Sequence, residues 1–204
     1  MNDKLVCVVN SQTSNLSSLT SALKYLKIKY KVINKYNSSI NFTHLILPGV
    51  GSFGYVMQNL IKNKLDKLIY ESNFKKKKIL GICLGMQLLF ESSTESKSSK
   101  GLGLIKGDIK KFKKKYKSPH IGFNYVYHDG KDIWKGIKNP SPFYFVHSYK
   151  LCKVKEKNLK IYKSEFGEKF VSFVKKENIY GAQFHPEKSH KFGLQLLKNF
   201  LYEV

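Results

Sequence analysis

The sequence contains no arginine: all 37 basic residues are lysine, and with 14 acidic residues they give a formal net charge of +23. Proteins that read nucleic-acid sequence favour arginine, because its guanidinium group binds guanine and phosphate through two hydrogen bonds. The lysines are spread along the chain, and no repeating aromatic platform interleaves them. We therefore expect a solvated lysine-rich surface that binds polyanions weakly and nonspecifically, and no specific nucleic-acid partner.

Cysteine is scarce, with three residues (Cys7, Cys83 and Cys152) and no Cys-x-x-Cys pair. This pattern argues against a disulfide framework or a structural zinc site and favours a reducing cytoplasm. Neither a metal ion nor another cofactor is expected. Long apolar runs are also missing, so no segment reaches the length of a membrane-spanning helix. The short run Leu5–Val9 reads as a strand rather than a signal peptide, and we expect no membrane partner.

The first half of the chain alternates between two periodicities. Short apolar runs predict buried strands, whereas apolar residues at helical spacing predict helices over 16–26, over 56–69 and from Met86 onward. The predicted strands are Leu5–Val9, Tyr30–Ile33, Leu45–Leu47 and Ile79–Ile82. This alternation predicts an α/β fold, with a mostly parallel central sheet and helices on both faces. The length fits a single domain over residues 1–204.

The middle of the chain has a different character. Glu91–Lys100 has no apolar periodicity and is predicted to be an exposed loop. Residues 104–175 are rich in aromatic and turn residues, with alternating runs that predict antiparallel strands; examples are Ile121–Tyr127, Phe143–Val146 and Phe170–Val174. A final helix is predicted over 192–201, with Ser189 as its N-cap.

A candidate nucleophile lies where the strand ending at Ile82 meets a helix. Cys83 is enclosed by Gly81 and Gly85, whose missing side chains permit the tight turn that exposes a nucleophile. The following helix would favour its thiolate. A free cysteine is more often a small buried core residue, but the two glycines favour the nucleophile.

A base for this nucleophile is available near the C-terminus. Pro186 ends a strand-like segment directly after His185, and Glu187 lies two residues on, close enough to accept a hydrogen bond from the imidazole. Cysteine, histidine and an orienting carboxylate form a nucleophile–base–orienter set. The other isolated histidines, His44, His128 and His190, are interpreted as structural or exposed. Pro48–Ser52 also follows a predicted strand, so three distant strand ends meet at the edge where α/β proteins place their active sites.

Four stretches together resemble the class I (triad) glutamine amidotransferases, and more narrowly the glutaminase subunit of imidazole glycerol phosphate synthase. They are Gly81–Gln87 with His185–Glu187, Leu47–Phe53, Pro119–Asn124 and Phe143–Tyr149. The resemblance runs from about Val6 to the end. It implies a three-layer, flavodoxin-like fold with an additional smaller antiparallel sheet.

The resemblance also implies roles for particular residues. Cys83, His185 and Glu187 would hydrolyse glutamine, and the backbone of Leu84 and of Gly49-Val50-Gly51 would form the oxyanion hole. Gln87, Ser148 and Tyr149 would hold the amino-acid end of glutamine, although Gln87 alone reads as a polar residue on an exposed helix turn. Asn15, Phe123, Tyr144 and Lys188 would face a cyclase (HisF-type) barrel subunit, which receives the ammonia as the other half of a heterodimer.

Two departures keep alternatives open. Asn10–Ser14 differs from the segment usual in that subunit, and Phe123 stands where tryptophan is usual. The alternatives are a paralogous glutaminase subunit that supplies a bacterial surface-sugar amidotransferase and, from a different class, a cysteine peptidase or a noncatalytic binding module on the same fold.

Overall fold

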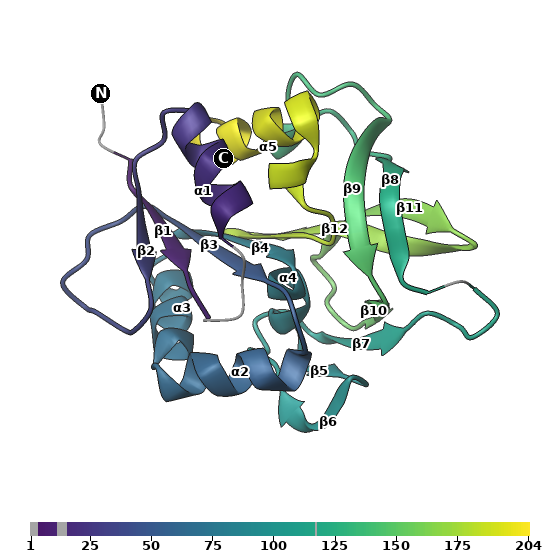
Figure 1. Ribbon diagram of the computed structural model, residues 1–204, viewed down its shortest axis with the longest axis horizontal. Helices are drawn as coiled ribbons and strands as arrows, with labels where there is room; N and C mark the ends of the chain where they lie inside the picture. Colours follow the sequence, from purple (N-terminus) through teal and green to yellow (C-terminus); the bar gives the residue numbers. More distant parts are fainter. Residues whose placement is uncertain (1–3, 12–15, 117) are drawn as a thin grey trace.

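The computed structural model describes residues 4–11, 16–116 and 118–204, and it is built around a seven-stranded sheet (Figure 1). The strand order is β11-β12-β13-β4-β3-β1-β2. The five strands from β13 to β2 run parallel, whereas β11 and β12 are antiparallel to their neighbours. The strands are β1 (Val6–Val9), β2 (Tyr30–Ile33), β3 (His44–Gly49), β4 (Lys78–Cys83), β11 (Lys160–Phe166), β12 (Glu168–Lys176) and β13 (Ile179–Ala182).

Helices cover both faces of this sheet. Figure 1 shows α1 (Ser17–Tyr25) and α5 (His190–Tyr202) on one face, with α2 (Phe53–Lys62), α3 (Leu65–Phe74) and the short α4 (Leu84–Leu88) on the other. Each face has its own apolar core, because strand side chains alternate between the two sides. The mostly parallel α/β architecture predicted from the sequence is therefore confirmed.

The prediction of one helix over 56–69 is wrong, because two helices cover this range. Lys64 takes a left-handed conformation, with φ of 56°, between α2 and α3. The apolar spacing continues across the break, since Leu60 and Leu65 are both fully buried. A periodic pattern alone therefore did not reveal the turn.

Two smaller sheets extend the fold beside the main sheet. A four-stranded sheet has the order β10-β7-β5-β6, and an antiparallel pair joins β8 to β9. Their strands are β5 (Ser92–Ser93), β6 (Ser96–Lys100), β7 (Gly107–Lys111), β8 (His120–Val126), β9 (Ser141–His147) and β10 (Tyr149–Val154). Short 3-10 turns, η1 (Asp132–Trp134) and η2 (Pro186–Lys188), complete the elements.

The prediction that Glu91–Lys100 is an exposed loop is wrong. β5 and β6 lie in this range, and Ser93 is buried. The Glu95 carboxylate accepts a hydrogen bond of 2.8 Å from the backbone N–H of Phe53, the first residue of α2. A carboxylate is stabilised at a helix N-terminus by the unpaired N–H groups there. This segment is therefore held by backbone pairing and a helix end, neither of which requires apolar periodicity.

In the part of the chain that the structure describes, no helix is both long and apolar enough to cross a membrane. The last helix begins at His190, directly after Ser189 as predicted, but the Ser189 hydroxyl makes no capping hydrogen bond. The Ser189 hydroxyl instead hydrogen-bonds to the backbone of His185 and Tyr144, next to the candidate active site.

Candidate active site

Cys83 ends β4 in a strained turn. Its φ of 55° and ψ of −112° lie outside the regions that L-residues prefer. Glycine is required on either side because of close packing: a β-carbon on Gly85 would overlap the carbonyl oxygen of Leu47, and one on Gly81 would lie 2.7 Å from the carbonyl oxygen of Gly85. The sharp turn places the Cys83 sulfur beyond the end of the sheet, although Cys83 is only 6% exposed.

His185 follows β13, the strand beside β4, and is fastened to β9. Its backbone N–H donates to the Tyr144 carbonyl oxygen over 2.8 Å. The Ser189 hydroxyl donates to the His185 carbonyl oxygen over 2.6 Å and accepts from the Tyr144 N–H over 2.9 Å. Sequence reasoning missed this use of Ser189, because it depends on the approach of a strand 45 residues away.

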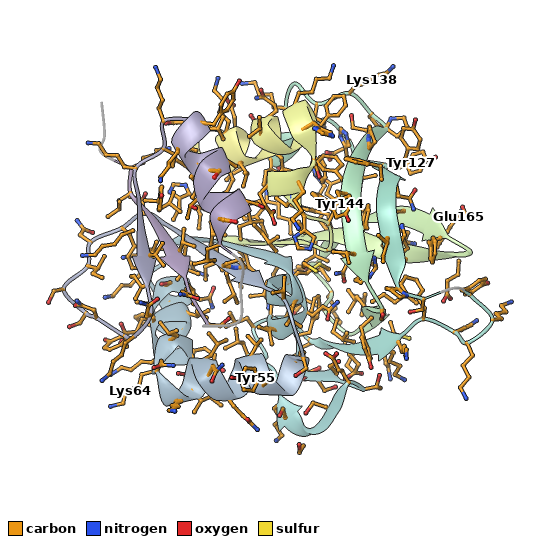
Figure 2. All side chains as sticks on the ribbon, in the orientation of Figure 1. Tyr55, Lys64, Tyr127, Lys138, Tyr144 and Glu165 are labelled. Carbon is orange, nitrogen blue, oxygen red and sulfur yellow. The ribbon has the colours of Figure 1, made fainter. Side chains whose placement is uncertain are left out.

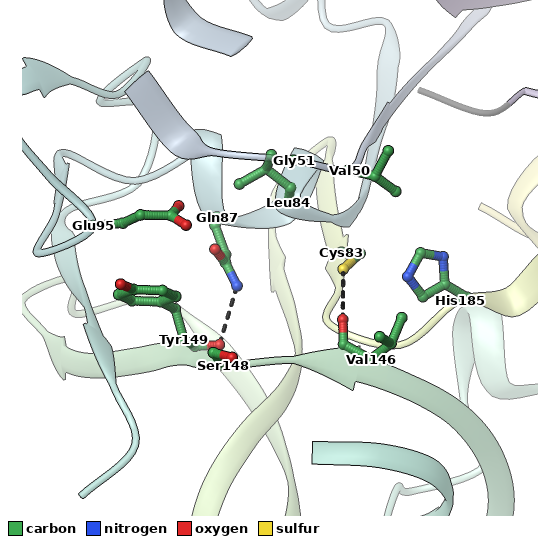
Figure 3. A pocket seen from close by; sticks show the side chains of 10 residues that line it. All are labelled: Val50, Gly51, Cys83, Leu84, Gln87, Glu95, Val146, Ser148, Tyr149 and His185. Atoms are coloured by element: carbon green, nitrogen blue, oxygen red, sulfur yellow. Dashed lines mark hydrogen bonds between the residues drawn. The ribbon is translucent and has the colours of Figure 1, made fainter. Parts of the chain in front are cut away.

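The His185 ring lies between Glu187 and Cys83. Its Nδ1 donates to Glu187 Oε1 over 2.7 Å, which leaves Nε2 without a hydrogen-bond partner among the described residues. Figure 3 shows the ring beside the Cys83 sulfur. Burial lowers the pKa of His185, but Cys83 and Glu187 outweigh burial and raise the pKa to about 10. The geometry therefore brings together the three residues predicted as a triad.

A cavity of about 280 Å³ opens at this point. It is lined by Val50, Gly51, Cys83, Leu84, Gln87, Glu95, Val146, Ser148, Tyr149 and His185 (Figure 3). These residues come from the ends of β3 and β4, from α4, from the β5–β6 turn, from the junction of β9 and β10, and from the segment after β13. The volume suits a ligand the size of one amino acid.

The predicted oxyanion residues converge at one end of this cavity. Gly49 is paired with Cys83 in the parallel register of β3 and β4. A β-carbon on Gly49 would lie 2.8 Å from the Gly85 nitrogen, so glycine permits the close approach of the two chains. Gly51 has φ of 96° and open space around it. The Val50–Gly51 segment therefore lies beside the cysteine turn without being packed in place.

Gln87 is a buried residue at the cavity floor rather than one on an exposed helix turn. Its Nε2 donates to the Tyr149 carbonyl oxygen over 3.1 Å and to Gln183 Oε1 over 3.0 Å. Gln183 is fully buried and directs its own Nε2 toward the Cys83 sulfur, 3.9 Å away. The sequence predicted no role for Gln183 or for Glu95. Gln183 could have been recognised as a candidate site residue, because it lies two residues before His185 at the end of the same strand.

Three of the predicted partner-facing residues lie together with His190 on one surface patch, which we call the aromatic patch: Phe123, Tyr144, Lys188 and His190. The rings of Phe123 and Tyr144 are 5.5 Å apart, and Phe123 stacks on His190 at 5.3 Å. Lys188 Nζ lies 5.9 Å from the Tyr144 ring centroid. Tyr144 belongs to β9 of the β8–β9 pair (Figure 2). Asn15 lies outside the described residues.

The three histidines predicted to be structural or exposed have other surroundings. His44 and His128 are buried, and burial lowers the pKa of each, that of His44 to about 4. His190 is exposed and belongs to the aromatic patch. Within residues 4–11, 16–116 and 118–204, no group of three or more His, Cys, Asp or Glu side chains is arranged to hold a metal ion.

The model of the family "Glutamine amidotransferase class-I" matches residues 7–204. The chain is 42% identical over 197 residues to the imidazole glycerol phosphate synthase subunit HisH of Bacillus cereus (strain ATCC 10987 / NRS 248), covering 96% of this chain and 93% of that protein. The HisH of Bacillus anthracis (strain CDC 684 / NRRL 3495) shows the same identity and coverage.

Solved structures share the fold at lower identity. A crystal structure of a glutamine amidotransferase superimposes with a TM-score of 0.76 at 15% identity, covering 96% of both chains. The PurLQS structure from Thermotoga maritima gives a TM-score of 0.76 at 18% identity, covering 97% of both chains. The chain belongs to the class I glutamine amidotransferase family and, within it, to the HisH subunits of imidazole glycerol phosphate synthase.

Proposed function

We propose that this chain hydrolyses glutamine to glutamate and ammonia, and delivers the ammonia to a cyclase (HisF-type) barrel subunit. The complex would use it to form imidazole glycerol phosphate and AICAR in histidine biosynthesis. One observation carries the proposal: in a chain 42% identical to HisH proteins, His185 stands between Cys83 and Glu187 on the wall of an amino-acid-sized cavity. The proposal treats residues 1–204 as one cytoplasmic domain.

The chemistry follows from the three side chains. His185 Nε2 holds the proton taken from the Cys83 thiol, so the sulfur attacks the side-chain amide carbon of glutamine as a thiolate. His185 then gives this proton to the departing nitrogen, so ammonia leaves and a thioester remains on Cys83. Water hydrolyses the thioester, which releases glutamate and restores the thiol. Glu187 fixes the proton of His185 on Nδ1, so that Nε2 faces the sulfur.

The negative oxygen that forms during the attack needs hydrogen-bond donors. The backbone N–H of Leu84 is one candidate, and an N–H of the Val50–Gly51 segment is the second. Each such donor typically stabilises the transition state by about 3 to 4 kcal/mol. Because a β-carbon at Gly51 would meet no described atom within 4 Å, there is room for this peptide to turn, and the second donor would then form when the partner binds. The oxyanion hole would in this way couple glutamine hydrolysis to the partner.

The far end of the cavity suits the amino-acid group of glutamine. Gln87, Ser148 and Tyr149 supply polar groups there, and the Glu95 carboxylate adds a negative charge that suits the substrate ammonium. Glutamine would therefore lie with its amide at Cys83 and its charged end between Glu95 and Ser148.

The partner would dock over the aromatic patch. Phe123 is 51% exposed, and aromatic residues are enriched at protein–protein interfaces. A groove of about 540 Å³ between α1 and η2 reaches Glu187 and Lys188 beside this patch. Ammonia must pass directly into the partner, because free ammonia in water is protonated and loses its nucleophilicity. Lys188 would pair with an acidic residue of the barrel subunit.

The relatives favour the histidine pathway over the surface-sugar alternative, since the curated proteins at 42% identity are HisH subunits. A peptidase would need a groove for an extended chain, and the cavity at Cys83 instead suits one small molecule. A noncatalytic binding module would have no use for the strained cysteine or for the aligned histidine.

The test is Cys83→Ala in complex with a HisF-type partner and its nucleotide ligand. We expect glutamine-dependent synthesis to be abolished, while synthesis from added ammonium salt persists at the wild-type rate. Cys152→Ala, at an exposed cysteine on β10, is the matched control and should keep both activities. A glutamine-affinity label should modify Cys83 in the wild type; no labelling, or no stimulation of glutaminase turnover by the partner, would contradict the proposal.

A further inference from the structure

Two buried histidines outside the triad face each other across the β8–β9 pair. His120 and His147 are directly opposed in the antiparallel register, and each is at least nine-tenths buried. The His120 ring is sandwiched between Phe145, at 4.9 Å, and Phe166, at 4.2 Å. Histidines enclosed in this way are costly to charge. The mechanism above uses neither of them.

The donor and the acceptor of each hydrogen bond made by His120 and His147 can be assigned. His147 Nδ1 lies 2.8 Å from the Tyr149 carbonyl oxygen, which can only accept, so Nδ1 carries the proton. Burial lowers the pKa of His147 to about 3, so the ring is neutral and its Nε2 is an acceptor. His120 Nδ1 lies 3.1 Å from this Nε2 and must therefore donate to it.

The same reasoning extends this series of hydrogen bonds to Asn124 on strand β8. We call the series from Asn124 through His120 and His147 to the Tyr149 carbonyl oxygen the relay. Burial lowers the pKa of His120 to about 4, so its Nε2 is also an acceptor. Asn124 Nδ2 lies 3.3 Å from this Nε2 and uses its other hydrogen for the Glu165 carbonyl oxygen, at 2.7 Å. Every donor and acceptor in the relay has one consistent assignment, with both imidazoles carrying their proton on Nδ1.

The relay ends on an atom that the candidate substrate pocket depends on. The Tyr149 carbonyl oxygen accepts from Gln87 as well as from His147, and Gln87 holds Gln183, which reaches the Cys83 sulfur. Ser148 and Tyr149 line the cavity at the same place. At its other end, the relay begins one residue after Phe123 of the aromatic patch.

We propose that His120 and His147 are positioning residues for glutamine: their relay from Asn124 to the Tyr149 carbonyl oxygen holds the Ser148–Tyr149 segment and Gln87 in the geometry that binds the substrate. The proposal rests on the function proposed above. It assigns no contact with glutamine to either imidazole; both act through the backbone of Tyr149 and the side chain of Gln87.

Two variants of His147 separate the two halves of the relay. In His147→Asn, the amide nitrogen replaces Nδ1 as donor to Tyr149, and the acceptor for His120 is lost. In His147→Gln, an amide oxygen near the position of Nε2 keeps the acceptor, and the donor to Tyr149 is lost. His44→Gln is the matched control, because His44 is a buried histidine at the start of β3, away from the relay.

Glutaminase kinetics should be measured in the complex with the cyclase partner. We expect His147→Gln to raise the glutamine KM by about tenfold, from the loss of one hydrogen bond that orders the pocket, with a smaller change in kcat. His147→Asn should keep a KM within about threefold of wild type, and His44→Gln should lower stability without changing KM. An unchanged KM in His147→Gln would overturn the proposal, as would equal effects of the two His147 variants.

A spectroscopic test does not depend on activity. Long-range ¹H–¹⁵N correlation spectra at pH 7 should show both His120 and His147 as neutral Nδ1–H tautomers, with Nδ1 protons protected from exchange. An Nε2–H tautomer or a charged ring at either position would refute the relay even in an active enzyme. A wild-type complex without glutaminase activity, in contrast, would contradict the proposed function itself.

Discussion

His185 Nδ1 and Glu187 Oε1 are 2.7 Å apart, although one residue, Pro186, separates the two in the chain. The η2 turn makes this possible, because it folds Glu187 back toward the ring of the histidine that precedes it. The pair is almost fully buried, with 4% and 9% of the two side chains exposed. Glu187 can therefore control both the orientation and the charge of His185.

Glu187→Gln should separate orientation from charge. The amide still reaches His185 but carries no negative charge, so the pKa of His185 should fall, and kcat for glutamine should decrease by about 10² to 10⁴-fold. NMR titration of His185 and steady-state kinetics measure the two effects. Glu177→Gln, at an exposed carboxylate paired with Lys76, is the control and should change neither quantity.

Gly51→Ala should affect activity more than stability. The residue has φ of 96°, and a side chain there costs about 1–2 kcal/mol of backbone strain. Gly130→Ala provides a matched control, since Gly130 also has positive φ and open space but lies far from the cavity in sequence. Both variants should lose similar stability in urea unfolding, but only Gly51→Ala should reduce partner-stimulated glutaminase activity. Equal activities would rule out a turning oxyanion peptide.

Gly49→Ala is a poor test of the same idea. Its β-carbon would press on the Gly85 nitrogen and on Leu84, and would displace the cysteine turn whether or not the Val50–Gly51 segment turns.

Phe123→Ala should weaken binding of the cyclase subunit at least about tenfold, as the loss of a central aromatic anchor commonly does. Phe74→Ala is the control, because Phe74 is 86% exposed at the end of α3 and lies outside the aromatic patch. Calorimetric titration with the partner measures both. The same dissociation constant for Phe123→Ala and wild type would place the interface elsewhere.

Stability should fall as the pH drops below about 6.5. Burial lowers the pKa of His44 and His120 to about 4 and that of His147 to about 3, whereas an unfolded histidine titrates near 6.5. Between pH 6.5 and the lowered pKa values, these histidines are protonated in the unfolded chain but neutral in the folded chain. Each fully titrating histidine therefore lowers the free energy of unfolding by about 1.4 kcal/mol per pH unit.

His185 contributes in a different pH range. Its pKa is raised to about 10, so it is protonated in both states below pH 6.5 and adds no slope there. Its stabilising effect is lost as the pH rises from 6.5 toward 10. Urea unfolding at half-unit pH steps measures both ranges, and His44→Gln should reduce the acid slope by one proton. A free energy of unfolding that stays constant from pH 6.5 to 5 would contradict this account.

The features that the sequence predicted correctly are those with a local cause. Val6–Val9 and Lys78–Cys83 are strands because continuous apolar runs suit a sheet buried on both faces. The turn at Cys83 could be predicted because Gly81 and Gly85 stand on either side of it, and no residue with a side chain would fit at either position.

The features that were missed depend on contacts between distant segments. Gln183 is a polar residue whose role arises only when β13 lies beside β4. His120 and His147 face each other through a register that residue spacing does not determine. The break at Lys64 carries no glycine or proline, and the pairing of β5 with β6 involves serine-rich segments without apolar alternation.

The arrangement of the sheets predicts different dynamics on the two sides of the cavity. Cys83 ends β4, which is hydrogen-bonded to β3 and β13 at the centre of the main sheet, whereas β8 and β9 pair with each other. In the described part of the chain, isolated bridges at Tyr127–Lys163 and Tyr144–His185 join this pair to its surroundings. Backbone amides of β4 should therefore exchange with deuterium far more slowly than those of β8. Slower exchange in β8 on addition of the barrel subunit would then report docking separately from any response at the cysteine.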